Sequence, residues 1–227
     1  MSDLIPPHSV AARLISACPS DWRDYTTHRF VTGLGAGTLP EAAFRYYLKQ
    51  DYLFLIHFAR AHALAVYKAD TVADMRSAAA AVHALIDHEM RMHVEFCAGW
   101  GLTEAEMASV PEDPACVGYT RYVLDRGMAG DILDLLVALA PCTIGYGVIG
   151  SALAKDPATK RNGNPYDAWI SMYSGPEYLD GVREATSQLD RVFEARGGAA
   201  RIDPLTATFR EATRLESRFW QMGLDAA

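Results

Sequence analysis

Hydrophobic residues recur at intervals of three and four along most of the chain, and charged or polar residues fill the positions between them. This spacing places the hydrophobic side chains on one face of an α-helix, whereas a strand would alternate every second residue. Alanine, leucine and methionine are abundant and runs of β-branched residues are rare, which also favours helices. The pattern therefore predicts an all-α protein.

Capping and turn residues divide this pattern into helices. The first long helix is expected in the segment TLPEAAF, where Thr38 can cap the N-terminus and Pro40 suits the first turn. The polar stretch DPATKRNGNP is expected to be a loop. Short connections predict a helical bundle with one domain over residues 1–227. The other expected helices run from Thr71 to Trp100 before Gly101, up to Gly127, and over residues 131–154, 166–175, 177–196 and 203–223.

The overall charge excludes some partners. The net charge is −7, and acids and bases are interspersed, so we expect no basic face for nucleic acid or anionic lipid. The N-terminal segment lacks the features of a signal peptide, and no stretch is expected to reach the length of a transmembrane helix. We therefore expect a cytoplasmic protein. The cysteines are scattered without a CxxC pair, which predicts reduced thiols and no zinc site.

Two acidic residues interrupt the hydrophobic faces of their predicted helices. Asp51 lies among apolar positions, and Glu216 shares a face with Phe209, Phe219 and Trp220. A buried carboxylate without a partner is unfavourable and its pKa rises, so each acid is expected to be hydrogen-bonded, paired with a cation, or poised to bind a ligand. The alternative for Asp51 is a structural carboxyl group that ties two helices together.

A cysteine directly follows a proline in the apolar run LVALAPCTIGYGVIGSAL. Free cysteine is usually a small buried hydrophobic residue, which is the alternative to a reactive role for Cys142. Pro141 should loosen the turn that carries the thiol, and Tyr146 places a hydroxyl group one turn away. An aromatic cluster near the polar loop would suit a flat heteroaromatic ligand. Its members are Tyr119, Tyr122, Tyr166, Trp169 and Tyr173.

Histidines raise the possibility of a metal site. The segment DHEMRMHVEF places Glu89 and His93 one turn apart, and His57 and His62 precede them. Helical bundles build di-iron sites from Glu and His, but this spacing is neither Glu-x-x-His nor His-Glu-x-x-His, and no second helix repeats it. We therefore expect no metal, and we expect these residues on a helix surface and in interhelical contacts.

Several motifs together resemble the TenA family, also called thiaminase II or aminopyrimidine aminohydrolase. They are GTLPEAAFRYYLKQDYLFLIHFARAHALA, GYTRY, APCTIGYGVIG, NPYDAWISMYSG and ESRFW, in the order and spacing of the family. The resemblance implies a haem-oxygenase-like helical bundle, a homotetramer, and no metal or cofactor. It also implies hydrolysis of 4-amino-5-aminomethyl-2-methylpyrimidine, a thiamine breakdown product, to the hydroxymethyl pyrimidine, and in many members cleavage of thiamine.

The same resemblance implies roles for individual residues. The catalytic residues would be Cys142, Glu216 and Asp51, and the substrate-binding residues Tyr119, Tyr146, Tyr173 and Phe54. By this assignment Cys142 adds to the pyrimidine ring, Glu216 protonates the ring, and Asp51 binds the exocyclic amine. Tyr146 would hydrogen-bond the sulfur. Ammonia or thiazole then leaves, water attacks the methylene carbon, and the cysteine is expelled.

Two other classes of function stay open at this point. Members of the family have been described as transcriptional activators, so a regulator that does not contact DNA is one alternative. A di-metal oxidase or a quinone-cofactor synthase on the same fold is the other. The sequence does not choose between the aminomethyl pyrimidine, its formylated precursor and thiamine as the preferred substrate.

Overall fold

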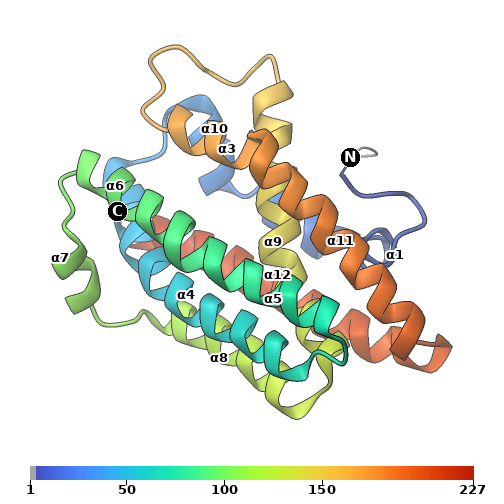
Figure 1. Ribbon diagram of the computed structural model, residues 1–227. Helices are drawn as coiled ribbons and strands as arrows, with labels where there is room; N and C mark the ends of the chain where they lie inside the picture. Colours follow the sequence, from blue (N-terminus) through green and yellow to red (C-terminus); the bar gives the residue numbers. More distant parts are fainter. Residues whose placement is uncertain (1–3) are drawn as a thin grey trace.

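The computed structural model describes residues 4–227, and every regular element in this range is helical (Figure 1). The prediction of an all-α protein is confirmed. The elements are α1 (Val10–Ala17), α2 (Pro19–Thr26), α3 (Arg29–Ala36), α4 (Glu41–Lys68), α5 (Val72–His83), η1 (Ala84–Glu89), α6 (Met90–Gly99), α7 (Glu104–Ser109), α8 (Pro114–Ala129), α9 (Ile132–Lys155), α10 (Asp167–Ser174), α11 (Pro176–Arg196), η2 (Ala199–Arg201) and α12 (Ile202–Asp225).

The helix predicted from Thr71 to Trp100 is present, but it is not uniform. Thr71 caps α5 as its side chain accepts a hydrogen bond from the backbone N–H of Asp74, and the helical run ends at Gly99. Between α5 and α6, residues 84–89 form the π-helical segment η1. The predicted cap of the preceding helix is wrong, because α4 begins after Pro40 and no side chain caps it.

Gly127 does not stop α8, which continues to Ala129. The glycine instead lies where α8 packs closely against leucine side chains of other helices. A Cβ atom at Gly127 would lie 2.8 Å from Leu135 Cδ1 and 2.9 Å from Leu64 Cδ2, closer than real Cβ contacts allow. A helix-stop signal and a close helix crossing look alike in the sequence, since both place a glycine at the end of a helical pattern.

Local capping chemistry fixes the start of α9. The Asp131 carboxylate accepts hydrogen bonds from the backbone N–H groups of Leu133 and Asp134, and the Asp134 carboxylate accepts one from Asp131. Arg201, in η2, donates to Asp131 at 2.6 Å and to Asp134 at 2.8 Å. These charge-assisted bonds hold the first turn of α9 against the turn before α12.

Helix α9 lies at the centre of the fold. It packs against α8, α10, α11 and α12, and α4 packs against α5, α8 and α12 (Figure 1). Helix α9 also contacts α4. Asp51, Cys142 and Glu216 are carried by α4, α9 and α12 respectively, so the three predicted catalytic residues come from mutually packed helices.

Helix α9 also corrects one expectation. Its 24 residues are apolar enough to cross a membrane by length and composition, although no such stretch was expected. Most of the helix is buried inside the fold, and Leu133, Leu135 and Val137 are fully buried. An α-helix that is hydrophobic on all sides is typical of the core of a large helical bundle.

Gly150 on α9 is predicted not to tolerate a side chain. A Cβ atom there would lie 2.6 Å from the backbone carbonyl carbon and oxygen of Tyr173 on α10, which cannot rotate away. We expect Gly150→Ala to lower the free energy of unfolding, measured in urea, by about 1–3 kcal/mol.

Gly118→Ala on α8 is the matched control, because a Cβ atom there meets nothing within 4 Å. Alanine is the better helix former, so this variant should gain up to about 1 kcal/mol. Equal stability of the two variants would contradict the close packing of α9 against α10.

Candidate active site

The structure brings Cys142, Glu216 and Tyr119 together from three helices. The Tyr119 hydroxyl donates a hydrogen bond to Glu216 Oε1 at 2.7 Å. The Cys142 thiol also hydrogen-bonds to the Glu216 carboxyl group. Tyr119 and Glu216 are almost completely buried, whereas Cys142 keeps part of its surface accessible. One carboxyl group thus joins a candidate nucleophile to a phenol.

Burial raises the pKa values of both Glu216 and Cys142. The pKa of Glu216 rises to about 8 because its charged form is desolvated, and the hydrogen bonds from Tyr119 and Cys142 oppose this rise. The pKa of Cys142 rises well above its usual value through desolvation first, and then through the negative charges of Glu216, Glu89 and Asp51. Both groups therefore hold a proton more strongly than they would in water.

Asp51 lies deep in the same region, and among residues 4–227 the basic side chain that it contacts is His93. Desolvation raises the Asp51 pKa well above its usual value, the charges of Glu89 and Glu216 raise it further, and a hydrogen bond with Tyr47 opposes the rise. The Nδ1 atom of His93 is 3.4 Å from Asp51 Oδ2. A neutral Asp51 and a neutral histidine are the protonation states that this buried pair favours.

The tautomer of His93 follows from its second contact. Its Nε2 atom lies 2.9 Å from the backbone carbonyl oxygen of Leu48, and this oxygen can only accept, so Nε2 carries the hydrogen. Desolvation lowers the His93 pKa to about 4, against the opposite effect of the Leu48 hydrogen bond, and the ring is neutral. Nδ1 therefore faces Asp51 as an acceptor, and a protonated Asp51 can donate to it.

Aromatic rings surround these polar groups. The ring centroids of Tyr146 and Tyr173 are 4.8 Å apart, and those of Trp169 and Tyr173 are 4.6 Å apart. On the side of α4, the rings of Phe54 and Tyr119 are 5.1 Å apart. The predicted substrate-binding residues therefore form two aromatic pairs from α4, α8, α9 and α10. Such pairs suit a flat ring that needs stacking surfaces and hydroxyl groups.

Tyr47, which the sequence analysis did not assign to the site, connects these groups. Its hydroxyl accepts a hydrogen bond from Trp169 Nε1 at 3.3 Å and one from Tyr146, and it hydrogen-bonds Asp51. The expected bond from Tyr146 to the sulfur is therefore wrong, because Tyr146 binds Tyr47 and the thiol binds Glu216. The position of Tyr47, four residues before Asp51, was the available signal.

The expectation for Glu89 and His93 is only partly correct. His93 makes the expected interhelical contact, but it is buried at 6% exposure rather than on a helix surface. Glu89 is half-buried, and its charge acts on Asp51 and Cys142. In residues 4–227, no three metal-ligating side chains converge as a metal site would require.

Two members of the predicted aromatic cluster lie outside the site. The Tyr166 ring stacks on Trp100 at 5.7 Å, and its hydroxyl donates to a backbone carbonyl. The Tyr122 hydroxyl donates to the backbone oxygen of Thr208 at 3.4 Å. Both are structural contacts, so the sequence cluster overstated the number of ring-binding residues.

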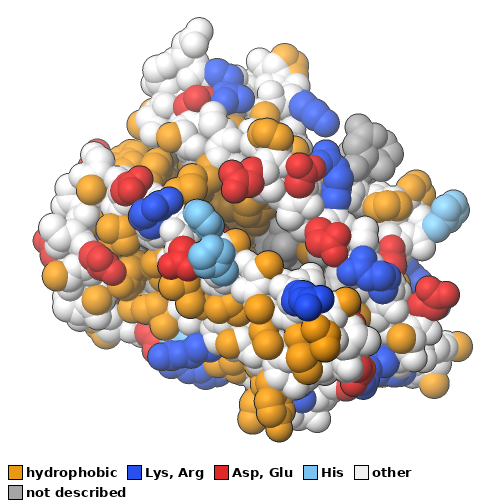
Figure 2. Space-filling model, in the orientation of Figure 1, with side chains coloured by type: hydrophobic (Ala, Val, Ile, Leu, Met, Phe, Trp, Pro, Cys, Tyr) orange, Lys and Arg blue, Asp and Glu red, His pale blue; other side chains and the backbone are white. Residues whose placement is uncertain are grey.

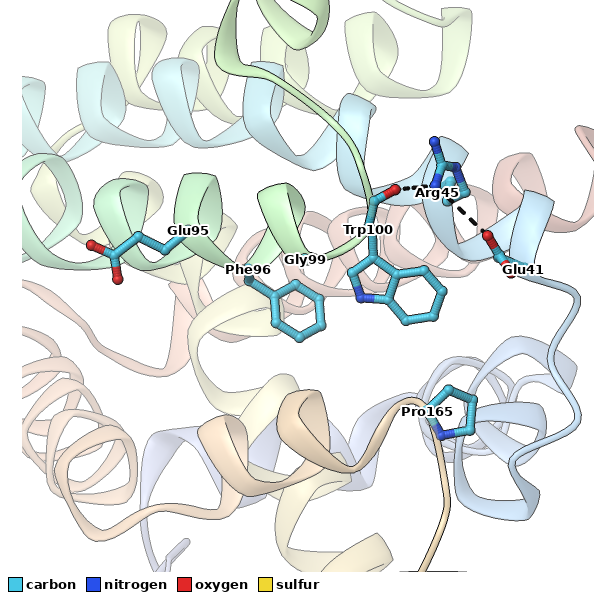
Figure 3. A pocket seen from close by; sticks show the side chains of 7 residues that line it. All are labelled: Glu41, Arg45, Glu95, Phe96, Gly99, Trp100 and Pro165. Carbon is cyan, nitrogen blue, oxygen red and sulfur yellow. Dashed lines mark hydrogen bonds and ion pairs between the residues drawn. The ribbon is translucent and has the colours of Figure 1, made fainter.

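The surface is hollowed on the face that carries α5 and α11, and hydrophobic side chains line this hollow (Figure 2). A separate cavity of about 610 Å³ lies between α6 and the segment before α10 (Figure 3). Its lining contains no candidate catalytic residue, and Arg45 crosses it to bond the Trp100 carbonyl oxygen and to pair with Glu41. The lining residues are Glu41, Arg45, Glu95, Phe96, Gly99, Trp100 and Pro165.

Known proteins share this fold and align over most of this chain. An aminopyrimidine aminohydrolase of Halalkalibacterium halodurans is 32% identical over 94% of this chain and 95% of its own. The crystal structure of a TenA family transcription regulator from a Silicibacter species is 43% identical, covers 99% of both chains and has a TM-score of 0.92. A Shewanella denitrificans domain with a heme oxygenase-like fold aligns over 94% of this chain and 91% of its own, at 16% identity and a TM-score of 0.74.

The fold expectation is thereby confirmed as haem-oxygenase-like. The sequence model of the TENA/THI-4/PQQC family matches residues 17–226, which is nearly the whole chain. The chain belongs to the TENA/THI-4/PQQC family.

Proposed function

We propose that the protein hydrolyses 4-amino-5-aminomethyl-2-methylpyrimidine to 4-amino-5-hydroxymethyl-2-methylpyrimidine, with Cys142 as the nucleophile, and that it also cleaves thiamine. The observation that carries this proposal is the hydrogen-bonded group of Tyr119, Glu216 and Cys142, together with the packed aromatic rings of the site. The name of the Halalkalibacterium relative, an aminopyrimidine aminohydrolase, supports the same reaction and a place in thiamine salvage.

Glu216 moves the proton in the proposed addition step. The thiol hydrogen-bonds to this carboxyl group, so the carboxylate can accept the thiol proton and deliver it to a ring nitrogen. The thiolate of Cys142 then bonds to the ring carbon next to the substituted one, and a ring electron pair moves onto the protonated nitrogen. A pKa of about 8 lets one carboxyl group both accept and donate a proton near neutral pH.

Asp51 suits the aminopyrimidine edge of the ring. A protonated carboxyl group offers one acceptor oxygen and one O–H donor side by side. With the O–H turned from His93 Nδ1 to the substrate, these match the exocyclic amino group, which donates, and the adjacent ring nitrogen, which accepts. The raised pKa of Asp51 favours this protonated form, and the hydrogen bond with Tyr47, which opposes the rise, fixes the orientation of the carboxyl group.

The second half of the proposed reaction restores the ring. Electrons from the dearomatised ring expel ammonia, or the thiazole of thiamine, and break the C–N bond. Water then bonds to the exposed methylene carbon and loses a proton. Cys142 leaves as a thiolate, and the proton on the ring nitrogen returns through Glu216 to the sulfur, so no external oxidant or reductant is needed.

The alternative functions have less support. The Silicibacter relative is named a transcription regulator, but the net charge of −7 here gives no basis for direct DNA contact. A di-metal oxidase would need converging ligands, which residues 4–227 do not provide.

The homotetramer and the cytoplasmic location stay predictions. Exposed hydrophobic side chains on α4, α5, η1 and α6 support an interface between subunits, because such surface is unfavourable in water. They are Tyr67, Val72, Met75, Ile86 and Met92.

Replacing the proposed nucleophile should abolish hydrolysis. We expect Cys142→Ser to remain folded and to lose at least about 100-fold in kcat for both substrates, because the serine hydroxyl is a far weaker nucleophile at neutral pH. Release of hydroxymethyl pyrimidine, followed by chromatography, measures this.

Cys18→Ser is the matched control. Cys18 is buried away from the site and donates to the Leu14 carbonyl oxygen at 3.3 Å, a bond that serine can keep. Full activity of Cys142→Ser, or inactive wild type on both pyrimidines, would refute the proposed chemistry.

Removing the Tyr119 hydroxyl should shift the pH profile upward. Its hydrogen bond favours the ionised form of Glu216, so Tyr119→Phe raises the pKa of that carboxyl group above about 8. The limb of the kcat/KM profile on which activity rises with pH should move up by about one pH unit. Tyr122→Phe, on the same helix but outside the site, should leave the limb in place. If the limb does not move in Tyr119→Phe, ionisation of Glu216 does not control the rate.

Glu216 should also make stability depend on pH. Its pKa is raised from about 4.5 to about 8 on folding, so it destabilises the fold as pH rises between these values. Glu216→Gln should match wild type near pH 4 and exceed its free energy of unfolding by up to about 5 kcal/mol above pH 8. Urea unfolding across this range measures the difference. The same change at half-buried Glu211 on α12 is the control, and a pH-independent difference for Glu216→Gln would contradict the raised pKa.

A further inference from the structure

Glu89 is a fourth reactive group in the region of the site, and the proposed mechanism does not use it. It lies on η1, while Asp51, Cys142, Tyr173 and Tyr178 lie on α4, α9, α10 and α11. The Glu89 charge acts on all four of these groups and raises their pKa values. Its side chain therefore faces the interior of the bundle from a helix that carries no other proposed catalytic residue.

The π-helical segment explains why Glu89 faces inward. Leu85, Glu89 and His93 are spaced by four, and in a regular α-helix each step of four rotates the side chain by about 40° beyond a full turn. The wider π-helical turn over residues 84–89 reduces this drift. Leu85 and His93 are both buried, Glu89 between them is half-buried, and η1 packs against α4.

The carboxylate of Glu89 has no partner among residues 4–227. No hydrogen bond or ion pair within this range includes the Glu89 carboxylate. Within the same range, Asp51 and Glu216 also form no ion pair with lysine or arginine. Desolvation alone raises the Glu89 pKa to about 7. Glu89 and Cys142 nevertheless keep part of their surface accessible.

We propose that Glu89 binds the positively charged substituent of the substrate, the ammonium of the aminomethyl pyrimidine or the thiazolium of thiamine. This inference rests on the proposed function. Cys142, Glu216 and Asp51 take the pyrimidine ring, which leaves Glu89 as the acid for the group attached through the methylene carbon. A charge-assisted bond there holds the leaving group in line for C–N cleavage.

The cation also determines the protonation state of Glu89. The groups whose pKa values the Glu89 charge raises are Asp51, Cys142, Tyr173 and Tyr178, and none of them is positively charged at neutral pH. The nearby imidazole of His93 is neutral. A bound cation lowers the pKa of an adjacent carboxyl group, so Glu89 ionises when the charged substrate binds.

The experiment compares two ligands that differ only in the charge of the substituent. Binding of 4-amino-5-aminomethyl-2-methylpyrimidine and of the neutral hydroxymethyl pyrimidine is measured by calorimetry, in Cys142→Ser protein to prevent turnover. We expect Glu89→Gln to weaken the aminomethyl ligand by about tenfold or more, and the hydroxymethyl ligand by less than about twofold. Glu95→Gln, which removes the same charge from an exposed position on α6, should change neither affinity.

The outcomes separate this inference from the proposed function. Equal weakening of both ligands, or no weakening of either, would overturn the role of Glu89 while leaving hydrolysis by wild type intact. Inactive wild type would overturn the proposed reaction, but the two affinities would still test Glu89. Failure of Cys142→Ser protein to bind either ligand would overturn the role of Glu89, and together with inactive wild type it would overturn both.

Discussion

The burial of carboxyl groups without lysine or arginine partners is the constraint on which this structure depends. Asp51 and Glu216 are nearly inaccessible, and within residues 4–227 the groups that compensate them are hydroxyls, a thiol and a neutral imidazole. An ionised carboxylate in such surroundings is strongly disfavoured, so the groups keep their protons unless a ligand supplies positive charge. Burying these carboxyl groups is electrostatically unfavourable, and a basic, flat and positively charged ligand would compensate this cost when it binds.

Maintaining that environment requires precise packing of helices that are far apart in the sequence. Helix α9 carries Cys142 and contacts every other helix that supplies a catalytic candidate. Close approach at Gly150 sets its distance from the Tyr173 backbone, and the Asp131 cap paired with Arg201 fixes its first turn. The same rigidity keeps water away from the carboxyl groups, which is what raises their pKa values.

Much of this arrangement could be predicted from the sequence, because helical periodicity shows which face of each helix is apolar. A polar residue in such a face, as at Asp51 and Glu216, therefore stands out without a structure. Contacts between helices were harder to predict from the sequence. Gly127 looked like a helix end because its crossing partners are distant in sequence, and Tyr146 was assigned to the sulfur because only its own helix was considered. Glu89 was expected on a helix surface or in interhelical contacts, because regular α-helical spacing does not foresee a π-helical segment.

Protonation couples the groups of the site to one another. The charges of Glu89 and Glu216 each raise the pKa of Asp51, so ionising one acid makes the next harder to ionise. Such a site favours at most one negative charge at neutral pH without a ligand. A positively charged substrate lets Glu89 ionise, while Asp51 stays protonated and binds the aminopyrimidine edge. The environments of Asp51, Glu89 and Glu216 make all three weak acids. Their different roles therefore follow from where the bound ligand places its positive charge.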